Sequence, residues 1–235
     1  MPFTTSLLTY KSHVPIKHIS SLGYMHPGGK LIFKDQNTAI EYARKRVVKA
    51  LNADKPFERS LVIEGNAVLK EFGGKKDHVY LKIQDIIKNI KEFITVHGHP
   101  DILKSNSVDK GITYPISLQD LYGMLLQPKE MKSIVYNSKG EYSMVSKTKS
   151  GFSLNEPELD EIINEYNITV GQDGLLGMIF KKFRTVCRLV FSKNNADRKA
   201  VNEIRQRIFD IDEFLRFISQ KYNLEYKTNY SCLKK

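Results

Sequence analysis

The chain has 235 residues, 41% of them hydrophobic, with twelve Phe and twelve Tyr but no Trp. This composition excludes a disordered protein and fits one large domain, or one domain with extensions. Lys and Arg number 37 against 26 Asp and Glu, a formal net charge of +11, which favours an acidic partner such as nucleic acid, an anionic membrane surface or an acidic protein.

The N-terminal third is expected to begin irregularly and then form regular elements. Residues 1–37 hold three prolines and a Gly-Gly turn signal, so no strand or helix is predicted there. Apolar residues at helical spacing predict a helix over 38–52, with Thr38 as its cap. Two apolar runs at 58–65 and 67–72, joined at a Gly-Asn turn, predict a hairpin.

The rest of the chain alternates strand and helix patterns and then becomes helical. In chain order, the pattern predicts a strand at 77–83, a helix with an isoleucine stripe up to 90, a buried strand at 93–96, a helix at 117–127, a hairpin of 132–137 with 141–147, helices at 158–166, 175–191 and 197–222, and a last short strand within 223–231. The fold class is therefore α/β, one mixed sheet with helices on its faces.

The domain organisation is predicted from the same pattern. Residues 1–55 form an N-terminal extension with one helix, 56–147 form a core, and 148–235 form a basic helical extension packed on that core. The segment 147–156 is the best candidate boundary.

The two cysteines, Cys187 and Cys232, have no CxxC partners. This excludes a disulfide framework and a cysteine-based zinc site, and it predicts a cytoplasmic protein in a reducing compartment. We also expect no signal peptide and no membrane span, because no basic region precedes a long apolar region and no apolar run approaches about 18 residues.

Two histidines follow the buried strand at 93–96. His97 and His99 are two apart, so on an extended chain their side chains share a face and could reach one ion. A catalytic zinc needs three protein ligands and one open position, and Asp120 in the sequence Ser117-Leu-Gln-Asp120 is the candidate third ligand. The alternatives are that the histidines are solvated loop residues and that Ser-x-x-Asp is a helix capping box.

The combination of these motifs is more specific than either alone. His-x-His-Pro at 97–100, followed by Ser-x-x-Asp at 117–120, with an acid on an earlier strand, resembles the JAMM/MPN (JAB-like) zinc metalloprotease family. Its relatives include RadC-like proteins and JAMM domains of phages and bacteria. The resemblance covers roughly residues 56–147, and it implies an MPN-like curved mixed sheet flanked by helices.

The resemblance also implies a role for each site residue. His97, His99 and Asp120 would bind zinc, Ser117 would stabilise the oxyanion, and a glutamate of the first strand would act on the zinc-bound water. Glu58 opens that strand and is favoured for this role; Glu64 ends it. Their even offset puts both on one face, so alternation alone does not choose between them. An ordinary surface acid is the alternative at either position.

One departure from the family pattern lies between the two motifs. Seventeen residues, Pro100 to Ile116, separate His99 from Ser117, about twice the spacing common in relatives. We interpret 101–116 as an insertion beside the site. Asp101 and Asp109 within it are weaker alternatives for the third ligand.

The resemblance predicts a zinc-dependent peptidase or isopeptidase acting on a protein or peptide, such as a ubiquitin-like conjugate. A second hypothesis is a catalytically silent module of the same fold that binds nucleic acid or an acidic protein, and a third is hydrolysis of some other amide. The binding-module hypothesis rests on a cluster of basic residues, which either binds an anionic partner or is a solvated helix face. The cluster comprises Lys181, Lys182, Arg184, Arg188, Lys193, Arg198, Lys199, Arg205 and Arg207. The apolar residues of the same segment predict packing on the core or on a second subunit.

Overall fold

The computed structural model describes residues 23–25, 30–73, 90–102, 113–170 and 196–233. Within them, one sheet has the strand order β1-β2-β4-β3-β5-β6-β7-β8. The strands are β1 (Gly23–Met25), β2 (Leu31–Phe33), β3 (Arg59–Glu64), β4 (Ala67–Gly73), β5 (Phe93–Gly98), β6 (Glu130–Tyr136), β7 (Tyr142–Lys147) and β8 (Leu224–Thr228). The helices are α1 (Gln36–Leu51), α3 (Leu118–Leu126), α4 (Glu156–Val170) and α6 (Ala196–Lys221), with a 3-10 turn, η2 (Ser231–Leu233).

The sheet is mixed, which confirms the predicted α/β class. Strands β5 and β6 run parallel, whereas the other neighbouring pairs are antiparallel. Parallel neighbours need a crossover connection, and α3 lies in the connection between β5 and β6. The crossover therefore brings the start of α3 back toward the end of β5, where the two histidines lie.

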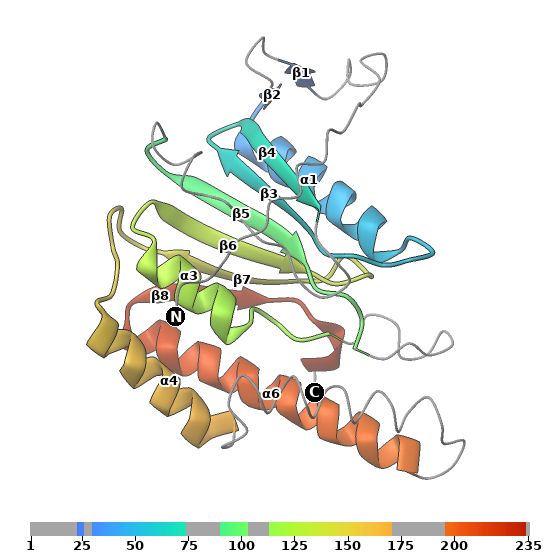
Figure 1. The fold of residues 1–235 in the computed structure, drawn as a ribbon, viewed down its shortest axis with the longest axis vertical. Coiled ribbons are helices and arrows are strands. Elements are labelled where there is room, and N and C mark those ends of the chain that lie inside the picture. The colour runs from blue at the N-terminus through green and yellow to red at the C-terminus, as the bar shows by residue number, and fades with distance from the viewer. Residues whose placement is uncertain (1–22, 26–29, 74–89, 103–112, 171–195, 234–235) are drawn as a thin grey trace, which may run out of the picture.

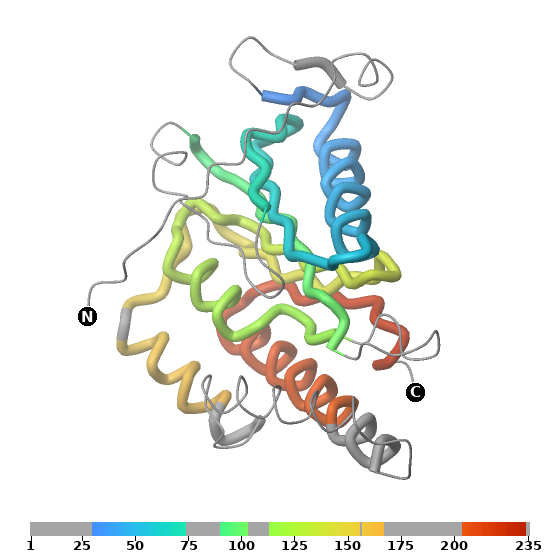
Figure 2. The backbone as a smooth tube through the Cα atoms, turned by 45° about the vertical axis from the view of Figure 1, so that its right-hand side comes forward, coloured from blue at the N-terminus to red at the C-terminus, as the bar shows by residue number. Residues whose placement is uncertain are grey.

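Helices cover both faces of this sheet (Figure 1). Helix α1 packs on one face, and α3, α4 and α6 lie on the other; Figure 2 shows the same separation from a second direction. The core under α1 includes Val47, Leu61, Ile63, Ile94 and Val96. The core under the other three helices includes Leu121, Val135, Leu159, Phe214 and Ile218.

Most predicted elements in the described ranges are confirmed within a few residues. They are α1, the β3–β4 hairpin, β5, α3, the β6–β7 hairpin, α4, α6 and β8. The turn of the second hairpin contains Gly140 at φ 76°, a left-handed conformation that glycine adopts without steric cost. The predicted strand at 77–83, nearly all of the helix that follows it and the helix at 175–191 lie outside the described residues.

Two predictions about the N-terminal part were wrong. Residues 1–37 are not irregular throughout, because β1 and β2 add to the sheet, and β2 pairs with β4 through Leu31 and Ile32. The cap of α1 is Asp35, whose side chain accepts a hydrogen bond from the Thr38 backbone N–H at 2.7 Å. Three-residue strands give too short a pattern to predict. Here β1 pairs with β2, and β2 joins the sheet through its pairing with the distant strand β4.

The sheet crosses the predicted domain boundaries. Strand β2 and helix α1 precede residue 56, and β8 follows residue 147, yet all three pack on or pair with the strands between those positions. The three-part division stays a prediction, and the described residues on either side of each boundary share one sheet.

Gly98 lies between the two histidines and faces α1. A Cβ atom there would be 2.5 Å from Val47 Cγ1 and 2.9 Å from Leu51 Cδ1. At distances this short, the side chains of Val47 and Leu51, or the elements that carry them, must shift. Glycine therefore lets α1 pack tightly behind β5 at the point where the histidines project from the other face.

Candidate metal centre

Strand β5 presents the two histidines from its carboxyl end. Thr95 and His97 are directed to the face that carries α3, whereas Ile94, Val96 and Gly98 are directed to α1. His99 comes one residue after the strand, and its backbone N–H donates to the Tyr136 carbonyl of β6 at 3.0 Å. The extended backbone therefore continues far enough to keep the predicted alternation through His99.

Helix α3 supplies the carboxylate from its first turn. Ser117 is the N-cap and Asp120 the third helical residue, and together they form a capping box. The Ser117 hydroxyl donates to Asp120 Oδ2 at 2.6 Å and accepts from the Asp120 backbone N–H at 3.1 Å. The capping interpretation of Ser-x-x-Asp is thus confirmed, and the capping box also fixes the direction of the carboxylate.

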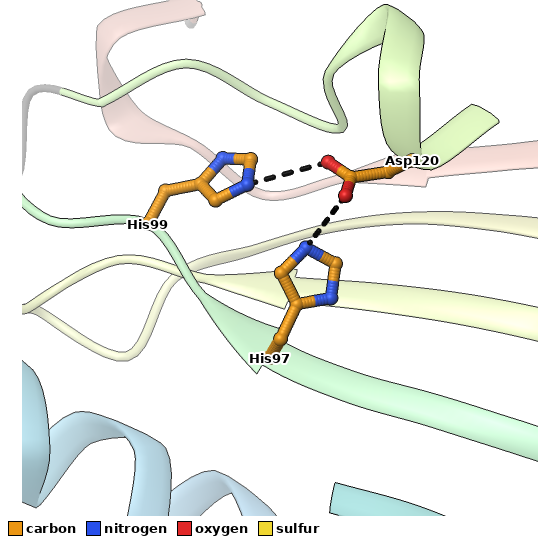
Figure 3. Close-up of side chains that lie close together, drawn as sticks. All are labelled: His97, His99 and Asp120. Atoms are coloured by element: carbon orange, nitrogen blue, oxygen red, sulfur yellow. Dashed lines mark ion pairs between the residues drawn. The ribbon is translucent and has the colours of Figure 1, made fainter. Parts of the chain in front are cut away.

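The three side chains converge (Figure 3). His97 Nε2 is 3.3 Å from Asp120 Oδ1, and His99 Nε2 is 3.3 Å from Asp120 Oδ2. The side chains are 12%, 15% and 23% exposed for His97, His99 and Asp120. One ligand atom from each lies within 4.8 Å of the others, so the structure contains a His–His–Asp group that could hold a metal ion.

The donor set of two imidazoles and one carboxylate is one that zinc accepts. Each histidine Nε2 is 3.3 Å from an oxygen of Asp120, His97 from Oδ1 and His99 from Oδ2. His97 Nε2 is buried, and despite its approach to Asp120 it lacks the alignment of a hydrogen bond and has no other partner. A buried polar atom without a partner is costly, and a cation would use its lone pair.

His99 is oriented by a backbone carbonyl. Its Nδ1 lies 3.2 Å from the Tyr114 carbonyl oxygen. A carbonyl only accepts hydrogen bonds, so Nδ1 carries the proton, and in the neutral ring the Nε2 lone pair faces Asp120. This arrangement, a ligand histidine held through its other ring nitrogen, is usual around protein-bound metals.

The charges of the group are strongly coupled. Burial opposes ionisation of Asp120, but the two histidines prevail and hold its pKa well below the usual range. Burial also favours neutral His99, yet Asp120, the charge of Glu58 and the Tyr114 carbonyl together raise its pKa. Asp120 is therefore an anion at neutral pH, as the binding of a metal cation requires.

The two candidate glutamates lie at opposite ends of β3, Glu58 one residue before its start and Glu64 at its last residue. Ser60 pairs with His97 in the antiparallel register, so continuing it by two residues places Glu58 opposite His99. The charge of Glu58 reaches the His99 ring. Glu64 lies at the other end, where its carboxylate accepts from the Lys91 backbone N–H at 3.3 Å. At roughly 3.3 Å per residue, six residues separate the two acids by about 20 Å along the strand.

Of the two alternative third ligands, Asp101 is not part of this group. The Asp101 carboxylate accepts from the Ser138 hydroxyl at 2.8 Å, and Asp109 lies outside the described residues. Thr113, within the 101–116 segment, lies beside Pro100, because its hydroxyl donates to the Pro100 carbonyl at 3.1 Å.

Sequence reasoning missed a buried polar cluster on the site face of the sheet. The Thr95 hydroxyl donates to Glu130 and lies 3.2 Å from the Ser133 hydroxyl. Burial raises the pKa of Glu130 to about 7, against the lowering effects of Thr95, His97 and Lys147. Burial lowers the pKa of Lys147 to about 8. No local signal distinguishes Glu130 from a surface acid at a strand start.

We expect Glu130 to make stability pH-dependent. The pKa of Glu130 in the folded protein, about 7, exceeds the ordinary value of 4.5. The contribution of Glu130 to the free energy of unfolding is therefore fully present below pH 4.5, where the carboxyl is protonated in both states, and it is lost as the pH rises toward 7. Glu130→Gln keeps an acceptor for Thr95 without the charge. The variant should therefore be more stable than the wild type at pH 8, by as much as roughly 3 kcal/mol.

The measurement is the free energy of unfolding by urea at several pH values between 4 and 8. Glu213→Gln, on the exposed face of α6, serves as the control. If Glu130→Gln kept the wild-type pH profile, the carboxyl of Glu130 would not be the group that titrates.

The basic cluster is only partly described. Lys181, Lys182, Arg184, Arg188 and Lys193 lie outside the described residues, as does Cys187, and the side chains of Arg198 and Lys199 are not described either. Arg205 is exposed on α6 and Arg207 is half-buried.

Cys232 is a free cysteine. None of the helices in the described ranges is long and apolar enough to cross a membrane.

Comparisons with protein-family models, with curated proteins and with solved structures give no match to this chain.

Proposed function

We propose that the protein is a zinc-dependent hydrolase of amide bonds, a JAMM-like metallopeptidase or isopeptidase. The observation that carries the proposal is the convergence of two imidazole Nε2 atoms on the two oxygens of Asp120 at 3.3 Å. Glu58, opposite His99 in the register, adds a second acid that the metal ligand set does not need. Two imidazoles and one carboxylate leave one open position, as catalytic zinc sites have.

Zinc bound by His97, His99 and Asp120 would polarise the scissile carbonyl and lower the pKa of a water toward neutrality. Glu58 takes a proton from the attacking water and later gives it to the leaving amine. The water oxygen forms a bond to the carbonyl carbon, the carbon–nitrogen bond breaks, and the products are a carboxylic acid and an amine.

Ser117 is the candidate donor to the developing oxyanion. In the resting structure its hydroxyl proton is directed at Asp120 Oδ2. A turn of the hydroxyl toward the carbonyl oxygen of a substrate would supply a hydrogen bond as negative charge develops there. The capping box keeps Ser117 at the start of α3, next to the ligand that it supports.

The proposal is tested by metal removal and return. Cleavage would be measured on fluorogenic peptides and on lysine isopeptides, including ubiquitin-like conjugates. We expect cleavage in the zinc-loaded protein, loss after chelation and recovery after adding zinc. A zinc-loaded protein that cleaves none of these substrates would instead favour the silent binding module.

A further inference from the structure

The Tyr114 carbonyl that orients His99 has a second donor. The hydroxyl of Tyr230 donates to the same oxygen at 3.4 Å, while His99 Nδ1 lies 3.2 Å from it. Tyr230 is 1% exposed. Burial raises the pKa of its phenol well above the usual range, so the hydroxyl keeps its proton and serves as a donor.

Tyr230 is itself fixed to the sheet. The Asn229 backbone N–H donates to the Tyr142 carbonyl of β7 at 3.0 Å, and the Tyr230 N–H donates to the Thr228 hydroxyl at 3.3 Å. The hydroxyl of Tyr230 therefore reaches the Tyr114 carbonyl from a support that is independent of the histidines. A rigid support of this kind holds functional groups more precisely than a free loop does.

The side chain of Tyr114 is held from α6. Arg207 lies beside its phenol, and its charge and hydrogen bond counter the increase in the pKa of Tyr114 that burial causes. Tyr114 also packs on a small buried apolar cluster made of Ile102, Ile204 and Ile208. The side chain of Tyr114 is thus held in part by residues of α6, which are far from the ligands in sequence.

We propose that Tyr230 is a positioning residue for the metal centre, which acts through the Tyr114 carbonyl to fix the ring orientation and the Nδ1–H tautomer of His99. The inference rests on the metal centre of the proposed function. If the carbonyl were free to move, His99 would lose the acceptor that selects its Nδ1–H form, and the Nε2 lone pair would not be kept on the metal side.

The test compares Tyr230→Phe with Tyr226→Phe in the full chain. Tyr226 is a matched control, because its hydroxyl also donates a hydrogen bond, to Asp212 at 2.7 Å, but not to the Tyr114 carbonyl. Zinc affinity is measured by competition with a chromophoric chelator. Loss of a partner beyond the ligands costs about 10–100-fold; we expect about tenfold weaker binding for Tyr230→Phe and unchanged binding for Tyr226→Phe.

A second readout reports on the histidine directly. In long-range ¹H–¹⁵N spectra of the metal-free protein, at a pH where the rings are neutral, we expect one Nδ1–H tautomer for His99 in the wild type and a mixture in Tyr230→Phe. Wild-type zinc affinity with a single tautomer in Tyr230→Phe would overturn the inference. So would an equal loss in both variants, since that would reflect general loosening.

The two readouts separate this inference from the proposed function. If the wild type bound no zinc, the proposed function would fail. The tautomer of the metal-free protein would still show whether Tyr230 positions His99.

Discussion

Asp120→Asn is expected to abolish zinc binding at micromolar zinc, with an affinity loss greater than about 100-fold, because losing a ligand costs more than losing its outer partner. The amide keeps the shape of the side chain and an oxygen that can accept the Ser117 hydrogen bonds, so α3 keeps its capping interaction. What disappears is the negative charge that both histidine Nε2 atoms face at 3.3 Å. Zinc content and affinity are measured on the folded variant.

Asp101→Asn is the matched control, because it makes the same chemical change on a carboxylate that bonds Ser138 rather than the histidines. It should bind zinc as the wild type does. If Asp101→Asn lost zinc and Asp120→Asn kept it, the third ligand would be assigned wrongly.

Glu58→Gln is expected to reduce kcat by about 10²–10⁴-fold, the usual size of a general acid–base contribution. Zinc should stay bound. Glutamine cannot take the proton of the attacking water, but it fills the same space at the start of β3. Because Glu58 is not one of the His–His–Asp ligands, its loss should leave the zinc stoichiometry unchanged. The measurement pairs single-turnover cleavage with metal analysis on the same sample.

Glu64→Gln provides the comparison at the far end of the strand, where the carboxylate bonds the Lys91 backbone. Its activity should match that of the wild type. Full activity in Glu58→Gln would remove Glu58 from the mechanism.

The site group could be predicted because each of its parts has a local signal. A buried strand followed by His-x-His places two imidazoles on one face, and Ser-x-x-Asp marks a helix start whose third residue is an acid. The crossover from β5 to β6 through α3 then brings the two signals together. The capping box and the approach to the two histidines use the same carboxylate, that of Asp120.

The parts that escaped prediction depend on pairing between distant residues. Alternation could not choose between Glu58 and Glu64, whereas the register of β3 with β5 separates them. The same applies to β2, which exists through its pairing with β4. Tyr230 contacts Tyr114 across 116 positions of sequence, and no spacing or motif predicts such a contact.

We propose that His97, His99 and Asp120 together hold one zinc ion. An anomalous difference map at the zinc edge, from crystals grown with equimolar zinc, tests it most directly. We expect one strong peak per chain, about 2.0–2.1 Å from an imidazole nitrogen of each histidine and from an oxygen of Asp120. Crystals of zinc-treated protein with no peak among these three side chains, or with the only strong peak elsewhere, would contradict the account.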